Sequence, residues 1–520
     1  MNTSYRFLLA ACGSFVGVGL LSASGYCCEK DYVYNKTHFS ARPQGNYYFV
    51  NLMTTSDITH IPENETNYFN ATATLGFRQN TERYDLGRYY FTQIGPVIVG
   101  TVNTDVDIQN LQLGLANNYK GTVVLQPTVN DTLVDLDFFA GFDKWIPGSW
   151  LRLRLPFARN YWRQNMQSQT SADGAPYYPD GFADVATQRV DVVYGNVGDA
   201  MCGDLSFGQI PALSAGKLCC KAQSCWGLSD VHFEVGYDFV RREHGNVGVA
   251  LIGAGATGKP NGKACNACLI TPTIGTQNSW QLGVALRGQY QLFNFDNEKT
   301  ITLFADARLS HVFAGCTKRL LGLNVGDSTA FNYWLLLNHY DSNGVFQGVE
   351  RAANLLNKKV KVSAGGMGEV TIMAQTVKNQ WRLVLGYNGW FRSAERLSVM
   401  DMSFGSESEY YAIKDTVTPT WGTYVADETV SNIAQQPTSA IHQVTSLETI
   451  KLYAINPGDI DVCSAQHPET YSNTFFVSGG YHFKDTRADP FINLGGSVEF
   501  GRGNTALSTW GLYLQGGISI

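Results

Sequence analysis

Several charged side chains stand two residues apart inside segments that are otherwise apolar. Arg152 and Arg154, for example, alternate with leucines at positions 151, 153 and 155. Successive side chains of an extended strand point to opposite faces, so such charges share one face. The pattern puts eleven titratable residues on the polar faces of their segments: Asp135, Asp137, Arg152, Arg154, His232, Glu234, Asp238, Arg287, Asp306, Arg308 and Arg382. If these residues line a water-filled lumen, the lumen can pass water and its charges can select small solutes or ions. Alternatively, the charges pair across the lumen as structural salt bridges.

The clearest alternation begins at Trp280. Even-numbered positions from Trp280 to Leu292 are apolar apart from Gly288, whereas Gln281, Arg287 and Gln289 lie on the opposite face. Ten steps of ~3.3 Å make about 33 Å of strand. Tilted by about 40°, this strand covers roughly 25 Å, the height of the apolar band of a membrane barrel. Trp280 and Tyr290 are then expected at opposite membrane interfaces.

Repetition of this pattern predicts an all-β fold, a closed antiparallel transmembrane β-barrel of about 14–16 strands with long Cys-containing loops. An ionised side chain facing lipid costs about 2–4 kcal/mol at the bilayer midplane, so the charged faces are expected to point into the lumen. A soluble β-sandwich is the alternative, because its strands also alternate. Beyond the clearest segments, further candidate strands lie near 44–53, 69–78, 107–115, 246–255, 361–374, 473–484 and 489–501, with weaker ones at 87–102 and 185–195.

Long intervals separate some of these strands, whereas others are joined by tight turns, as outer-membrane barrels require. The long loops are expected near 196–228, 255–278, 314–360 and 401–472, with a further one at 159–185. Apolar residues at helical spacing predict a loop helix around 345–357. It could constrict the lumen, cap one end of the barrel or pack on a neighbour.

Cysteines are concentrated in two of the loops. The disulfide candidates are Cys202, Cys219, Cys220, Cys225, Cys265 and Cys268. In an oxidising compartment such thiols pair, whereas a CxxC segment such as 265–268 could instead hold zinc or carry redox chemistry. Adjacent Cys219 and Cys220 favour two different partners, possible also in another chain. We expect disulfides and no metal site.

The amino terminus predicts a signal peptide, residues 1–25, which leaves 26–520 for the barrel. Arg6 precedes an apolar run from Phe7 to Leu21, and small residues at 23–25 fit cleavage before Tyr26. After residue 25 no apolar run approaches the ~18 residues of a membrane-spanning helix. The net charge of −6 argues against a nucleic-acid partner. Nucleophile-elbow, P-loop and HExxH motifs are absent from the sequence, so neither an enzyme nor a cofactor is expected.

Taken together, the signal peptide, the alternating strands, the Cys-rich loops and the apolar final segment 510–520 resemble the major outer-membrane proteins of intracellular Gram-negative bacteria. The resemblance is one of architecture over the mature chain; the terminal Ile520 departs from the aromatic residue that commonly ends such barrels. It implies a porin-like channel of the bacterial outer membrane for passive diffusion of small hydrophilic solutes. The expected partners are outer-membrane lipid, the barrel-assembly machinery and further copies of the chain. The alternative is a structural or adhesive surface protein with a plugged barrel, disulfide-linked into the envelope.

Overall fold

The computed structural model describes most of the chain from residue 41 onward. The described residues are 41–520 except 44, 57, 61–65, 89–95, 102–105, 180–181, 184–188, 219–220, 259–267, 270–271, 296–298, 325–330, 405–408, 415–416, 421–422, 427–446, 448–449, 452–453, 484–487 and 503–505. The expected signal peptide, residues 1–25, lies outside them.

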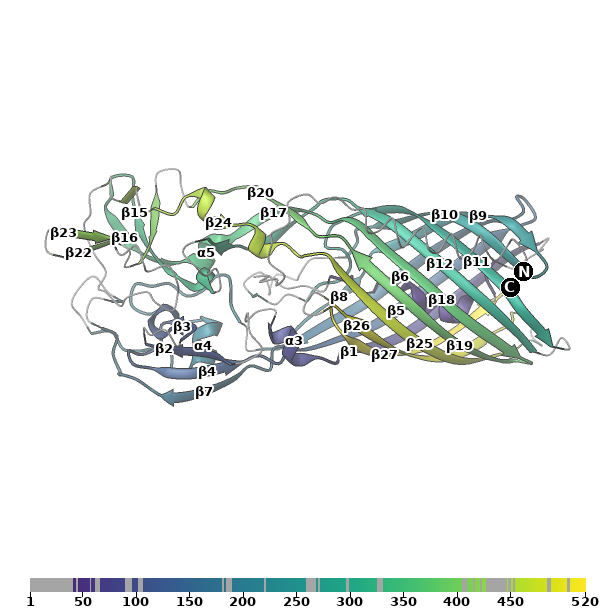
Figure 1. Ribbon diagram of the computed structural model, residues 1–520, viewed down its shortest axis with the longest axis horizontal. Coiled ribbons are helices and arrows are strands. Elements are labelled where there is room, and N and C mark those ends of the chain that lie inside the picture. Colours follow the sequence, from purple (N-terminus) through teal and green to yellow (C-terminus); the bar gives the residue numbers. More distant parts are fainter. Residues whose placement is uncertain are drawn as a thin grey trace.

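Twelve strands close into an antiparallel barrel, which occupies the right half of Figure 1. In chain order they are β1 (Asn67–Asn80), β5 (Thr128–Phe142), β6 (Ser149–Arg163), β9 (Val231–Arg242), β10 (Gly245–Gly255), β11 (Gln281–Phe295), β12 (Lys299–Val312), β18 (Gly365–Lys378), β19 (Trp381–Arg392), β25 (Thr470–His482), β26 (Phe491–Gly501) and β27 (Thr509–Ser519). The first and last of them pair with each other, from Asn70 opposite Ser519 to Asn80 opposite Thr509. β6 pairs with β5 along its length and with β9 at one end, while β8 (Gln223–Leu228) continues the sheet beside its other end.

The fold class predicted from sequence is confirmed, but the predicted number of strands is wrong: the barrel has twelve. Segment 44–53 is largely helix α2 (Tyr48–Thr55), and it lies inside the barrel. Segment 107–115 forms the short β3 (Ile108–Gln109) and a 3-10 turn outside the barrel. Both segments are rich in buried side chains, which made them resemble barrel strands.

The outer face of the barrel is apolar and its inner face is polar. In β11, Leu282 and Val284 are exposed, Val284 by 54%, whereas Gln281 and Arg287 are buried. Exposed aromatic and aliphatic side chains recur on the other strands, such as Leu75, Val235, Leu385, Val477, Leu494 and Leu514. A closed barrel satisfies every strand ladder internally and presents a mainly apolar band to lipid. The chain is therefore a barrel of the bacterial outer membrane.

Short turns join the strands at one end, and long connections leave the other end. The long connections, 81–127, 164–230, 256–280, 313–364 and 393–469, together form the structure at the left of Figure 1, which we call the head. The carboxyl terminus lies at the turn end, where Ile520 and Phe69 exchange backbone hydrogen bonds of 2.9 Å.

The head contains four small sheets and its own hydrophobic core. The sheets are β2 (Val97–Gly100), β3, β4 (Lys120–Val124) and β7 (Gln167–Ala172); β13 (Gly315–Leu320), β17 (Asn357–Ser363) and β20 (Arg396–Val399); β15 (Leu336–Tyr340), β16 (Phe346–Arg351) and β21 (Tyr410–Ile413); and β14 (Gly322–Leu323) with β24 (Ile460–Asp461). A hairpin of β22 (Val417–Thr420) and β23 (Thr423–Ala426) adds to them. One buried cluster extends from Leu86 to Ala465 and takes side chains from each of the five long connections.

Besides α2, the described part of the chain contains the short helices α3 (Arg83–Arg88), α4 (Val197–Cys202) and α5 (Ala352–Leu356). Within the described ranges, no helix is long and apolar enough to cross a membrane. The loop helix predicted around 345–357 is mostly wrong: β16 takes its first half, and only α5 is helical. Its buried residues, among them Ala353 and Leu356, pack into the core of the head and do not constrict the lumen.

Candidate functional site: the occupied lumen

A segment of the chain itself occupies the barrel lumen. Residues 41–60, which we call the plug, enter at the head end, where Ala41 packs on Val312 and Trp390. They reach the turn end at His60, whose carbonyl accepts a 2.9 Å hydrogen bond from Asn246. The plug thus runs along the lumen from the head end to the turn end.

The amino-terminal part of the plug makes a sharp turn before its helix. Gly45 has a φ of +88°, and a Cβ added there would lie 2.9 Å from Ser229, so a glycine is needed for both reasons. Its carbonyl accepts a 2.9 Å hydrogen bond from Arg154. The turn therefore fixes the start of α2 against β6.

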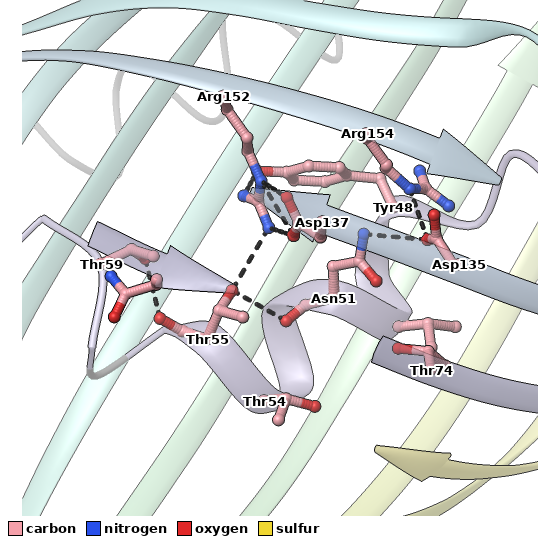
Figure 2. A network of polar contacts seen from close by, with 12 residues as sticks. Tyr48, Asn51, Thr54, Thr55, Thr59, Thr74, Asp135, Asp137, Arg152 and Arg154 are labelled. Carbon is pink, nitrogen blue, oxygen red and sulfur yellow. Dashed lines mark hydrogen bonds and ion pairs between the residues drawn. The ribbon is translucent and has the colours of Figure 1, made fainter. Parts of the chain in front are cut away.

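Helix α2 is buried on all sides because the wall surrounds it. Its polar side faces β5 and β6, where Asn51 donates to Asp135 at 3.1 Å and Thr55 accepts from Arg152 at 3.3 Å (Figure 2). Its apolar side faces β25 and β27, where Phe49 stacks on Phe476 with ring centroids 5.2 Å apart. The wall thus offers a matching polar and apolar half to one amphipathic helix.

Inward-facing glycines make room for the aromatic side chains of the wall. A Cβ added at Gly386 would lie 2.2 Å from the ring of Phe476, and one at Gly236 would lie 2.0 Å from Trp150. Those two rings in turn contact Phe49 and His60 of the plug. Small residues on the wall therefore contribute to the shape of the occupied lumen.

The plug contacts every strand of the barrel. The wall partners, in sheet order, are Asp135 (β5), Asn70 (β1), Gln515 (β27), Glu499 (β26), Phe476 (β25), Arg382 (β19), Gln375 (β18), Arg308 (β12), Arg287 (β11), Asn246 (β10), Asp238 (β9) and Arg152 (β6). Most of these contacts are hydrogen bonds made by wall side chains. A typical buried bond contributes about 0.5–1.5 kcal/mol, and bonds to charged groups about 1.5–3 kcal/mol. Together they hold the plug without making it part of the strand ladder.

Ten of the eleven sequence-predicted lumen residues also take part in ion pairs or plug contacts. Arg154 bonds Asp135 at 2.6 Å, and Arg308 reaches Glu234 at 2.7 Å. The remaining pairs and contacts are Arg152 with Asp137, Arg287 with Glu234 and Asp306, Arg308 with Asp306, Asp238 with His60, and Arg382 with the Thr54 carbonyl. His232 is half-buried on the same face of β9. The structure thus places these residues inward; their part in conduction stays a prediction.

Sequence reasoning missed two features of this site. The sequence predicts a strand near 44–53, within the plug, because the apolar residues there give no sign that the wall will surround them. The wall residues Glu369, Asn388, Glu499 and Gln515, which hold it, were not among the candidates. The alternation of β18, β19, β26 and β27 could have identified them, because each lies on the polar face of its strand.

A second buried charge cluster lies between the barrel and the head. Glu395 pairs with Arg319 at 3.2 Å and with Arg392 at 2.7 Å, and it accepts from the backbone of His467 at 3.1 Å. Burial disfavours the ionised carboxylate, but the two guanidinium groups outweigh it and hold the pKa of Glu395 below its usual value. Burial also lowers the pKa of His467 to about 4, so this imidazole is neutral at pH 7.

Cysteines of the head divide into two chemical states. Cys202, Cys268 and Cys463 are disulfide-bonded. Cys225 on β8 and the exposed Cys316 on β13 carry thiols. Cys219, Cys220 and Cys265 lie outside the described residues, so the connectivity expected for them stays a prediction. Among the described side chains, no group of three or more His, Cys, Asp or Glu is placed to hold a metal ion.

Neither a protein-family model nor a curated protein matches the chain. Comparison with solved structures finds an outer membrane channel from Pseudomonas putida F1, with 9% identity over 87% of this chain and 95% of that chain and a TM-score of 0.33. The NanC porin follows, with 6% identity over 86% and 98% and a TM-score of 0.27. A mutant of the TodX monoaromatic hydrocarbon channel has 8% identity over 88% and 90% and a TM-score of 0.31.

Proposed function

We propose that this protein is a plugged channel of the outer membrane, through which small hydrophilic solutes diffuse when the plug is displaced. The observation that carries this proposal is that the ring of twelve strand ladders is complete without residues 41–60. The barrel can therefore stay closed as a sheet while its lumen opens.

The chemistry of the wall supports a path for polar solutes. Arginine and carboxylate side chains line it at several levels, including Arg152 with Asp137 and Arg287 with Glu234. Charged rings of both signs in a hydrated pore attract polar solutes and set ion selectivity. With the plug in place, wall side chains are hydrogen-bonded to the plug, so solutes can flow only when the plug moves.

Single-channel recording in planar bilayers tests the proposal. The full chain is expected to conduct little, with rare openings, and a variant lacking residues 41–60 is expected to conduct steadily. Tyr237→Phe, on the lipid face of β9, is a matched control that should behave like the full chain. A heat-modifiable band on a denaturing gel must first show that each variant has assembled. An assembled deletion variant that conducts no better than the full chain would refute the channel.

A second candidate is a surface protein for which the barrel is an anchor. The specific observation in its favour is the head, whose core draws buried residues from five long connections, including Leu113, Phe207, Leu269, Leu337 and Tyr411. Loops that only border a pore do not need such a core. If the deletion variant is silent in bilayers, this anchoring role becomes the better account, and ligand capture by the intact cell surface is the measurement to make.

A further inference from the structure

The guanidinium group of Arg42 lies in a built cation site of the barrel wall. It donates to Glu499 on β26 at 3.0 Å, and to Glu369 on β18 and Asn388 on β19 at 3.0 and 3.1 Å. Trp390 on β19 lies 5.7 Å from it, within the range of a cation–π contact. Arg42 is only 4% exposed, so the site is almost fully shielded from solvent.

The wall positions this site independently of the plug. Asn388 donates to Glu369 at 2.7 Å, and Ser472 donates to Glu499 at 2.6 Å. Both carboxylates are therefore oriented by neighbouring strands. What the plug supplies is the cation.

Charge balance at this level of the lumen depends on Arg42. Glu369 and Glu499 accept from it, and Arg78 pairs with the second oxygen of Glu499. Without Arg42, two carboxylates remain beside the guanidinium group of Arg78. Buried charges that lose their partner are costly, so the displaced state needs another cation at this place.

We propose that Arg42 occupies a binding site for cationic solutes, and that a solute carrying a guanidinium or ammonium group takes its place when the plug moves. Arg42 then competes with the cationic solute for the same site. This proposal rests on the proposed channel for its physiological use, but the site itself can be tested without any current. It assigns cationic solutes, rather than anions, as the class that the open lumen favours.

Calorimetric titration with agmatine, which carries a guanidinium and an ammonium group, tests the site in detergent-solubilised protein. Arg42→Ala is expected to bind agmatine at least about tenfold more tightly than the full natural chain, whose site is filled. Adding Glu369→Gln to Arg42→Ala should weaken this binding by about tenfold or more. Arg502→Ala, which removes an exposed arginine of the head side, is the matched control and should bind like the natural chain.

Each outcome bears on one of the two proposals. An assembled Arg42→Ala protein that binds agmatine no better than the control overturns the cation site. Reversal potentials of the variant lacking residues 41–60 add a second readout. Cation selectivity that decreases when Glu369→Gln is added to this variant supports the site, whereas a current carried mainly by anions overturns it. If that variant does not conduct while Arg42→Ala binds agmatine, the channel fails and the cation site stands.

Discussion

Arg152 on β6 donates a 2.5 Å hydrogen bond to the hydroxyl group of Tyr48 in the plug, while its Nε atom bonds Asp137 on β5 at 2.8 Å (Figure 2). The pair with Asp137 fixes the guanidinium plane, so the donor that meets Tyr48 is oriented before the plug arrives. An ion pair of the wall thus serves as a holding point for the plug.

Tyr48→Phe should loosen the plug without changing the barrel. The substitution removes the hydroxyl that accepts from Arg152 and, at 3.5 Å, from Arg287, while keeping the ring that Arg308 contacts. A bond to a charged donor contributes about 1.5–3 kcal/mol. The fraction of time spent open in planar bilayers should rise by about tenfold or more. Tyr237→Phe on the lipid face provides the baseline, and equal open fractions for both variants would show that this bond does not hold the plug.

Substitutions on the two faces of β11 should differ in kind. Val284 faces lipid, and Val284→Arg should block assembly at a cost of about 2–4 kcal/mol. Gln289 faces the lumen and donates to the His60 carbonyl at 3.0 Å. Gln289→Arg should therefore assemble, but with a looser plug and more frequent openings. The heat-modifiable gel band measures assembly; two equally intense bands for these variants would contradict the orientation of the strand.

The faces of the barrel strands could be predicted from sequence, whereas the occupant of the lumen could not. Apolar and polar residues alternate along a barrel strand because one face meets lipid and the other meets the lumen. The alternation can be recognised in β11 because only one face of that strand is apolar. Phe49, Leu52 and Met53 of helix α2 stand at helical spacing, but the helix has only eight residues and the wall buries all of them, so this short run is predicted as a strand. Nothing local in the sequence marks a segment that is to be surrounded.

The head escaped prediction for a related reason. Its core joins residues that are far apart in the sequence, as where Trp334 donates to the carbonyl of Gly216, 118 positions away, at 3.0 Å. The sequence of each long interval does not show which of the other intervals its apolar residues will contact. Only the barrel, by bringing the ends of these connections together on one rim, allows them to share a core.

Acid should weaken the junction between barrel and head. Burial lowers the pKa of His467 from 6.5 to about 4. Between these two pH values the imidazole is protonated in the unfolded junction but stays neutral in the folded one, so acidification favours unfolding. Stability is thus complete above pH 6.5 and falls between pH 6.5 and 4, by up to about 3 kcal/mol. The depressed pKa of Glu395 acts in the same direction at the lower end of this range.

Hydrogen exchange of the backbone near residues 463–467 measures this effect between pH 7.5 and 4.5, after correction for the intrinsic pH dependence of exchange. Protection should decrease on acidification in the natural chain. His467→Gln, which cannot take up the proton, should show a flatter profile. A natural chain with constant protection over this range would contradict the account of a buried neutral imidazole.

Thiol chemistry should distinguish two cysteines of the head that lie in different states. Cys316 on β13 is exposed and carries a thiol, whereas Cys202 in α4 is buried and disulfide-bonded. A maleimide reagent applied to intact envelopes prepared without reductant should label Cys316 rapidly, and Cys316→Ser should remove that signal. Cys202 should become reactive only after denaturation and reduction, since its sulfur is committed to a disulfide. A disulfide restricts the unfolded chain and typically contributes about 2–4 kcal/mol, so reductant should also lower the temperature at which the head unfolds, while the heat-modifiable band of the barrel is retained. Labelling of Cys202 in denatured but unreduced protein would refute the disulfide, and bound metal would be the next assignment to assay.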